Sequence, residues 1–255
     1  MFKKRLIGAV IVKENLAIQS IGYKKYLPLG KPEIIVKNLD RWKADEILIS
    51  VIDRSKSNLE PNYKVLEKIK NINIRTPLIY GGGISSVDRA KKVIALGADR
   101  IVLESVVESD FLEFKKIINV IGNQSIIVSM PVSINNNKEL IFYDYKKEIE
   151  KKINQNFINA INDGLFSELM IIDYKNQGLM KGFNEKILKT FSKKIPLILY
   201  GGIYGIKNIK NILTDKRVNA ISIGNTLNYS EHSVQKTKSP LTNNYFRQPC
   251  FQKII

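Results

Sequence analysis

The sequence predicts a single (β/α)8 barrel, the α/β fold also called a TIM barrel, built by internal duplication of a half-barrel. Three observations predict it: apolar segments alternate with amphipathic ones, the apolar segments are nearly continuous, and two distant segments repeat each other. Strands of a parallel sheet are buried on both faces, so they read as continuous apolar runs rather than alternating ones. The length of 255 residues also fits one barrel, which typically takes about 250.

The expected elements follow in chain order. Strands are expected at residues 6–12, 47–52, 78–80, 101–103, 126–129, 169–172, 197–200 and 220–223. Helices are expected in the amphipathic stretches at residues 62–71, 86–96, 110–121, 147–163, 185–191 and 206–213. Eight strands with helices between them form the repeating unit of this barrel.

The internal repeat relates the two halves of the chain. PLIYGGGI at residues 77–84 resembles PLILYGGI at residues 196–203, an offset of 119 residues, and a helical pattern and another apolar run follow each. Two similar halves favour a duplicated barrel over a doubly wound open sheet, which needs no such symmetry. We therefore expect the barrel over residues 1–228 and an irregular, polar tail over residues 229–255.

Composition excludes several classes of protein. The chain has 41 Lys and Arg against 24 Asp and Glu, a net charge of +17, but the basic residues are dispersed without an Arg-rich stripe, so nucleic-acid binding is not expected. Codon bias, a phosphorylated ligand or an acidic partner remain open explanations. One histidine, His232, and one cysteine, Cys250, exclude a disulfide framework and a multi-thiolate metal site, so no metal or cofactor is expected.

No apolar run approaches the roughly 18 residues of a membrane span. The basic and then apolar N-terminus resembles a signal peptide, but its apolar run is short and charge resumes at Lys13. We interpret it as the first strand and expect a cytoplasmic protein.

Glycines follow strands at equivalent places in the two halves. Glycine permits positive φ and lets backbone N–H groups approach a ligand. In barrels, the loops after strands 7 and 8 commonly bind phosphate. The sequence therefore predicts one phosphate site in each half, suited to a ligand phosphorylated at both ends. The predicted residues are Gly82, Gly83 and Ser105 in the first half and Gly201, Gly202, Gly224 and Asn225 in the second. The alternative is that these glycines only form tight turns.

Seven segments carry a resemblance to a known family. They are KRLIGAVIVK (4–13), GGGI (81–84), GADRIVLES (97–105), GNQSIIVS (122–129), SELMII (167–172), GLMKGFN (178–184) and YGGI (200–203). On these segments the chain resembles the cyclase subunit of imidazole glycerol phosphate synthase, a duplicated (β/α)8 lyase of histidine biosynthesis. EPNY (60–63), Tyr80 and the run MKGF (180–183) make it similar to a paralogue of lipopolysaccharide gene clusters, called glycosyl-amidation-associated.

The resemblance implies a catalytic pair of aspartates at the ends of strands 1 and 5, acting as general acid and base. The matching positions here are Ile11 and Pro131, neither of which titrates. Further acidic positions of the family match Val51, Lys175 and Gln177. Asp53 and Asp173 are the nearest remaining carboxylates, and we expect them to make loop hydrogen bonds or helix caps. No catalytic residue is therefore assigned.

The resemblance also implies a gate through which ammonia enters from a glutaminase partner. Its four charged positions, at the N-terminal ends of strands 1, 2, 4 and 6, read Arg5, Glu46, Arg100 and Glu168. Four charges in one axial ring are costly unless opposite signs pair, and two of each sign meet that requirement. Asp99 matches a position at the glutaminase interface.

Three functions compete. The first is a barrel subunit that forms a heterodimer with a glutaminase and passes ammonia to a separate amidotransferase of nucleotide-linked or cell-surface sugars. The second is a functional imidazole glycerol phosphate cyclase with relocated carboxylates. The third is a non-catalytic barrel that binds phosphate as a scaffold. A kept gate together with a lost acid–base pair favours the first.

Overall fold

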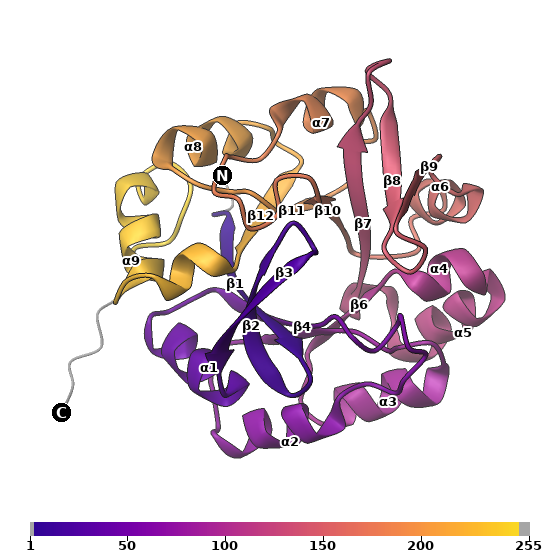
Figure 1. The fold of residues 1–255 in the computed structure, drawn as a ribbon, viewed down its shortest axis with the longest axis horizontal. Helices are drawn as coiled ribbons and strands as arrows, with labels where there is room; N and C mark the ends of the chain where they lie inside the picture. Colours follow the sequence, from indigo (N-terminus) through magenta and orange to yellow (C-terminus); the bar gives the residue numbers. More distant parts are fainter. Residues whose placement is uncertain (1–2, 250–255) are drawn as a thin grey trace.

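Eight parallel strands close into a barrel in the computed structural model, which describes residues 3–249, and helices surround it (Figure 1). The barrel strands are β1 (Arg5–Lys13), β4 (Glu46–Val51), β5 (Leu78–Gly81), β6 (Arg100–Leu103), β7 (Ile126–Ile134), β10 (Glu168–Asp173), β11 (Leu197–Tyr200) and β12 (Val218–Ile223). They pair in this order, and β10 pairs with β7 while β12 pairs with β1, which closes the cylinder. The predicted (β/α)8 barrel is confirmed, with each of the eight apolar runs in a barrel strand.

The helices connect these strands on the outside of the barrel. They are α1 (Pro32–Arg41), α2 (Tyr63–Asn71), α3 (Val87–Ala95), α4 (Ser105–Ser109), α5 (Phe111–Ile121), α6 (Gln155–Asn162), α7 (Glu185–Thr190), α8 (Ile206–Leu213) and α9 (Ser233–Lys238), with 3-10 turns η1 (Asn123–Ser125), η2 (Asn225–Asn228) and η3 (Ser239–Leu241). Local caps fix several starts: the Ser86 side chain accepts the Arg89 N–H before α3, and Asp110 accepts the Glu113 N–H before α5.

Alternation along the strands divides the core into two layers. On β1, Ile7, Ala9 and Ile11 pack inside the barrel, whereas Leu6 and Val10 pack against the surrounding helices. Successive side chains of a strand point to opposite faces, and here both faces are buried. This explains why the strand sequences are apolar throughout.

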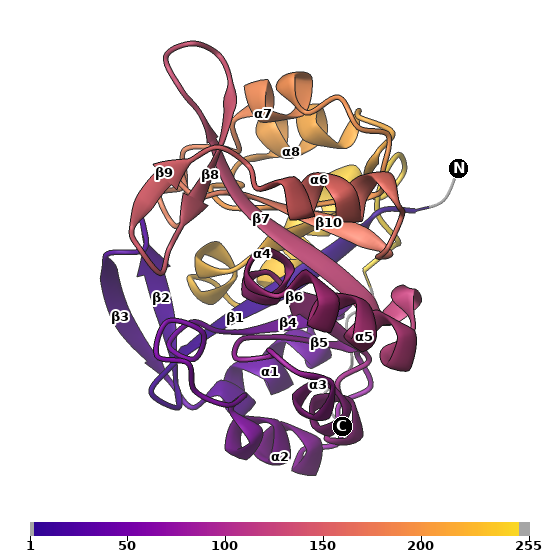
Figure 2. The same cartoon turned by 90° about the vertical axis from the view of Figure 1, so that its right-hand side faces the viewer.

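Two hairpins were not predicted from the sequence. β2 (Leu16–Ile21) and β3 (Lys25–Gly30) extend β1, and β8 (Leu140–Asp144) and β9 (Ile149–Lys151) extend β7. They follow the first strand of each half, so their positions repeat the half-barrel symmetry. In Figure 2 both hairpins lie at the end of the barrel opposite to the start of β1, which is the end where the C-terminal ends of the barrel strands meet.

The helix expected over residues 147–163 is wrong in about its first half. Residues Ile149–Lys151 form β9, and α6 begins only at Gln155, where the Asn154 side chain accepts the Asn156 N–H. The Lys146 and Lys147 N–H groups donate to Asp144 Oδ1, at 3.0 and 3.1 Å, and this turn directs the chain back along β8.

The irregular tail predicted for residues 229–255 is also wrong in part, since the described portion contains α9 and η3. Val234, Leu241 and Phe246 are at most 5% exposed and join the outer core. These three apolar side chains, separated by polar residues, anchor the segment to the barrel. The mostly polar composition of the segment therefore gave a wrong prediction of irregular structure. Cys250 lies outside the described residues.

Candidate functional site

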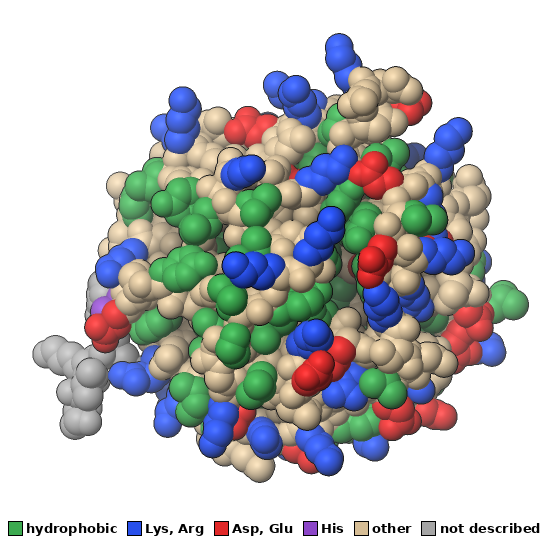
Figure 3. Space-filling view, viewed as in Figure 1, with side chains coloured by type: hydrophobic (Ala, Val, Ile, Leu, Met, Phe, Trp, Pro, Cys, Tyr) green, Lys and Arg blue, Asp and Glu red, His purple; other side chains and the backbone are tan. Residues whose placement is uncertain are grey.

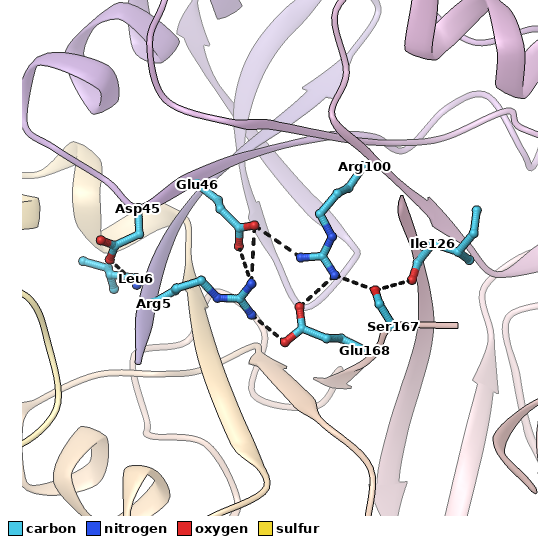
Figure 4. Close-up of polar contacts among 8 residues, drawn as sticks. All are labelled: Arg5, Leu6, Asp45, Glu46, Arg100, Ile126, Ser167 and Glu168. Carbon is cyan, nitrogen blue, oxygen red and sulfur yellow. Dashed lines mark hydrogen bonds and ion pairs between the residues drawn. The ribbon is translucent and has the colours of Figure 1, made fainter. Parts of the chain in front are cut away.

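Four charged side chains form a closed ring at the N-terminal ends of the barrel strands (Figure 4). Arg5 on β1 lies 3.4 Å from Glu46 on β4 and 2.5 Å from Glu168 on β10. Arg100 on β6 lies 3.2 Å from Glu46 and 2.7 Å from Glu168. Each cation therefore contacts both anions, and the structure brings together the four residues that the resemblance singled out.

Neighbouring groups fix the ring from two sides. Arg100 Nη2 donates to Ser167 Oγ at 2.8 Å, and that hydroxyl donates to the Ile126 carbonyl at 2.7 Å (Figure 4). Next to Glu46, the Asp45 carboxylate accepts the Leu6 N–H at 2.7 Å and pairs with Lys238 of α9 at 2.8 Å. The tail helix thus braces the end of the barrel that carries the ring.

The two carboxylates of the ring are held unequally. Burial alone raises the pKa of both, but hydrogen bonds and the charges of Arg5 and Arg100 outweigh it at Glu168 and lower its pKa. At Glu46 burial prevails over the same two arginines, and the pKa is raised. Glu168 is therefore the anion on which the charge balance of the ring mainly depends.

A cavity of about 180 Å³ opens at the opposite end of the barrel, beneath the two hairpins. Ile11 and Pro131, the positions of the family's catalytic aspartates, both line it. Their apolar side chains provide no proton donor or acceptor. The other family positions separate: Val51 and Gln177 line the cavity, whereas Lys175 forms an ion pair with Glu150 at 2.7 Å.

The glycine turn of the first half lines this cavity together with Ser105. Gly82 and Gly83 have φ of +127° and +75°, and a Cβ on Gly82 would lie 2.2 Å from the Val51 carbonyl oxygen. The Gly83 N–H donates to Ser55 Oγ at 3.1 Å. Close packing thus accounts for Gly82, and phosphate binding at this turn stays a prediction.

The glycine turn of the second half borders a smaller pocket of about 30 Å³, lined by Gly201, Gly202, Gly224 and Asn225. A Cβ on Gly201 would lie 2.5 Å from the Asp173 carbonyl oxygen, which repeats the packing of the first half. Ser222, 1% exposed, also lines the pocket, and its hydroxyl has no hydrogen-bond partner among the described residues. An unpartnered donor beside glycine N–H groups favours an anionic ligand, so phosphate is better supported here.

Sequence reasoning missed the ionisable group of the cavity, Glu104. It follows β6 directly, and the alternation Arg100, Val102, Glu104 places it on the inner face of the barrel. Its carboxylate accepts a hydrogen bond from Ser129 Oγ at 2.7 Å. Burial nevertheless raises the pKa of Glu104 to about 8. The alternation along residues 100–104 was the signal that would have found it.

Sequence reasoning also missed an aromatic lining. The tyrosines of the cavity are Tyr23, Tyr26, Tyr143, Tyr145 and Tyr200. Tyr23 belongs to the turn of the first hairpin and lies 6.1 Å from the ring of Tyr143 on the second, so the two hairpins meet over the cavity. Burial raises the pKa of Tyr200 to about 12, so its hydroxyl stays protonated at neutral pH.

Three predicted carboxylates have structural roles. Asp53 accepts the Glu14 N–H at 2.9 Å, and Asp173 accepts the Asn184 N–H at 2.8 Å. Neither carboxylate lines the cavity. Both make the loop hydrogen bonds that were expected of them. Asp99 is exposed next to Arg100, and its carboxylate accepts the Leu78 N–H at 2.7 Å. Its predicted place at a partner interface stays a prediction.

Charge on the surface is dispersed. On the face shown in Figure 3, Lys and Arg side chains are scattered among acidic, apolar and neutral groups. Within residues 3–249, no helix has the length and apolar character of a membrane span, and no three side chains of His, Cys, Asp or Glu converge as metal ligands.

Comparison with known proteins gives a consistent result. A family profile described as "Histidine biosynthesis protein" matches residues 5–233. A Leptospira borgpetersenii protein provisionally named imidazole glycerol phosphate synthase subunit HisF is 25% identical over 234 residues, covering 90% of this chain and 91% of its own. A Campylobacter jejuni protein provisionally named subunit hisF2 is 30% identical over 205 residues, 80% of this chain and 81% of its own. The Pelodictyon phaeoclathratiforme imidazole glycerol phosphate synthase subunit HisF is 23% identical over 245 residues, 94% of this chain and 96% of its own.

Proposed function

The chain belongs to the histidine biosynthesis protein family, as a relative of the HisF cyclase subunit, and from this premise we propose that it receives ammonia from a glutaminase partner through the ring of Arg5, Glu46, Arg100 and Glu168. The ammonia then passes to a separate amidotransferase that modifies a sugar of the cell surface.

The ring is the observation that supports this proposal. Its four contacts, between 2.5 and 3.4 Å, hold two buried carboxylates on the barrel axis. Such a cluster is expensive to bury and contributes little net stability compared with apolar packing. A balanced, closed set of ion pairs is suited to opening for a small neutral molecule while excluding ions and bulk water.

The cavity explains why the acceptor is placed elsewhere. Ile11 and Pro131 face it and cannot serve as general acid and base, and one such group is typically worth about 10²–10⁴-fold in rate. A barrel that only conducts ammonia needs the ring of four charged side chains. It does not need the family's catalytic aspartates, because it closes no imidazole ring.

Nitrogen tracing tests the proposal. The barrel is combined with a candidate glutaminase and a candidate sugar amidotransferase, and supplied with glutamine labelled with heavy nitrogen in its amide, in excess unlabelled ammonium. We expect the sugar product to carry label with the wild-type barrel and to lose most of it with Arg5→Ala, because the opened ring exchanges ammonia with solvent.

The matched control is Lys116→Ala, which removes an exposed ion pair to Glu113 at 3.2 Å. It should leave the labelled fraction unchanged. An Arg5→Ala product as fully labelled as the wild type would overturn the proposed conduit.

The name of the Pelodictyon relative supports a second candidate, a functional cyclase of histidine biosynthesis. Complementation of a histidine auxotroph that lacks its cyclase subunit separates the two. Growth would show that the barrel closes the imidazole ring without carboxylates at positions 11 and 131, and absence of growth supports the conduit.

A further inference from the structure

Glu104 stands on the barrel axis above the ring. Arg100, Val102 and Glu104 occupy successive inward positions of β6 and its C-terminal end, so a rise of about 3.3 Å per residue separates Arg100 from Glu104 by roughly 13 Å. Val102 and Glu104 both line the upper cavity. A small molecule that passes the ring and reaches the cavity therefore meets the Glu104 carboxyl.

Within residues 3–249, the carboxyl of Glu104 forms no ion pair with a cation. Its hydrogen-bond partner is the neutral Ser129 hydroxyl at 2.7 Å. Lys146 acts on it through its charge, and Lys151 on β9 is paired with Asp144 at 2.6 Å and with Glu108. Glu104 thus differs from the ring carboxylates, each of which contacts two arginines.

The charged and titratable groups around Glu104 favour its protonated form. Burial is the largest cause that raises its pKa to about 8, and the charges of Glu108 on α4 and Asp144 on β8 add to it, while Ser129 and Lys146 oppose it. Tyr23 and Tyr145 lie near enough that Glu104 raises the pKa of each. At neutral pH the carboxyl therefore holds a proton that a base in the cavity can remove.

The walls suit a small cation. Tyr23, Tyr26, Tyr143, Tyr145 and Tyr200 surround the cavity. An ammonium ion is attracted to the faces of aromatic rings, most strongly where water is displaced. A carboxylate in a cavity lined by tyrosines provides a negative charge and aromatic surface, both of which attract ammonium.

We infer that Glu104 exchanges a proton with ammonia in the upper cavity and holds the product as ammonium beside its carboxylate. The inference deepens the proposed conduit and rests on it. The O–H bond of the carboxyl breaks and a fourth N–H bond forms, leaving an ion pair of carboxylate and ammonium. The reverse transfer returns the proton to Glu104 and releases ammonia to the acceptor.

Calorimetric titration of the purified chain with ammonium chloride tests this step, with sodium chloride at equal ionic strength as reference. Repeating it in buffers of different ionisation enthalpy counts the protons released. At about pH 7, binding of ammonium should release close to one proton, because Glu104 ionises as the ion binds; above about pH 8 the release should fall toward zero.

Glu104→Gln should weaken ammonium binding by at least about tenfold and abolish proton release. Glu104→Asp keeps a carboxyl and should retain proton release with weaker binding, so the pair remains informative if one variant folds poorly. Glu148→Gln is the matched control: this exposed carboxylate also borders the cavity but pairs with Lys56 at 2.5 Å, and its loss should leave proton release unchanged.

Equal heats for ammonium and sodium, or unchanged proton release in Glu104→Gln, would overturn the inference. The outcome is independent of nitrogen tracing with Arg5→Ala. A failed titration with intact tracing removes proton exchange and leaves the conduit, whereas failed tracing removes the conduit itself.

Discussion

The ring at the N-terminal ends of the strands and the cavity at their C-terminal ends both contain buried carboxyl groups, but the ring carboxylates are paired with arginines, whereas Glu104 in the cavity contacts a neutral hydroxyl. Glu168 contacts Arg5 and Arg100 at 2.5 and 2.7 Å, whereas Glu104 has the Ser129 hydroxyl. The pKa of Glu168 is accordingly lowered and that of Glu104 raised to about 8.

The difference shows how one cylinder separates two tasks. The two arginines lower the pKa of Glu168 and so favour its charged form, which keeps the ring closed by ion pairs. Glu104, buried beside the Ser129 hydroxyl in a cavity that tyrosines also line, has its pKa raised to about 8, so it can give and take a proton near neutrality. Closure at one end and proton exchange at the other are compatible with the proposed conduit for ammonia.

The largest expected effect comes from breaking the ring. Glu168→Gln removes one of its two negative charges and leaves Arg5 and Arg100 facing each other across the axis. Removing one partner of a buried ion pair typically costs about 3–5 kcal/mol, and we expect about 3 kcal/mol here because Arg5 is a quarter exposed. Denaturant unfolding measures it.

Lys116→Ala, which removes the exposed pair to Glu113, serves as the reference and should cost less than about 1 kcal/mol. Should Glu168→Gln cost no more than this reference, the ring would not depend on charge balance and the contrast between the two ends would fail.

A smaller effect is expected at the cavity, and it depends on pH. The folded pKa of Glu104, about 8, lies above the ordinary value of 4.5 for a glutamate, so between these values the folded state holds a proton that the unfolded state has lost. The stability of the wild type therefore falls as pH rises through this window. Glu104→Gln carries no such proton, so its stability relative to the wild type should rise from about pH 5 to about pH 8 and then level off.

Each unit of pKa difference corresponds to about 1.36 kcal/mol. If half of the Glu104 pKa shift is realised, the unfolding free energy of Glu104→Gln should rise by roughly 2 kcal/mol relative to the wild type across this pH range, as measured by denaturant unfolding. Glu148→Gln should show no such trend. A flat difference for Glu104→Gln would mean that its carboxyl titrates normally, and the contrast with Glu168 would disappear.

The barrel was predictable because its strands are buried on both faces. β1 has an apolar run at residues 6–12 and β10 at residues 169–172, and both runs are buried throughout. The hairpins escaped prediction because their outer strands lack that signal. β3, KYLPLG, is largely exposed and contains Pro28, and β9 has three residues, of which two are exposed.

Residues of the candidate site that belong to a recognisable motif were predictable from the sequence. Residues whose role depends on three-dimensional arrangement alone were not. The ring residues are the first residues of their strands and were identified by resemblance, and the structure brings them together. Glu104 lay inside a recognised segment, yet its importance depends on burial and on tyrosines from two hairpins that meet only in the folded chain. Gly82 was interpreted through backbone N–H groups, whereas its closest constraint is the Val51 carbonyl.

The smallest expected effect concerns the rim of the cavity. Lys56, in the loop after β4, pairs with Glu148 in the turn between β8 and β9 at 2.5 Å, but their side chains are 51% and 65% exposed. Exposed ion pairs contribute little because water screens them and both side chains lose conformational freedom. Lys56→Ala should therefore leave the unfolding free energy unchanged within error.

The same substitution should accelerate amide exchange in residues 145–150, because the pair ties the hairpin turn to the barrel. Amides of β7, in the buried core, should exchange as in the wild type. If Lys56→Ala instead destabilised the whole chain as strongly as Glu168→Gln, the rim would be as firmly fixed as the ring. The cavity would then lack the adjustable cover that the proposed release of ammonia needs.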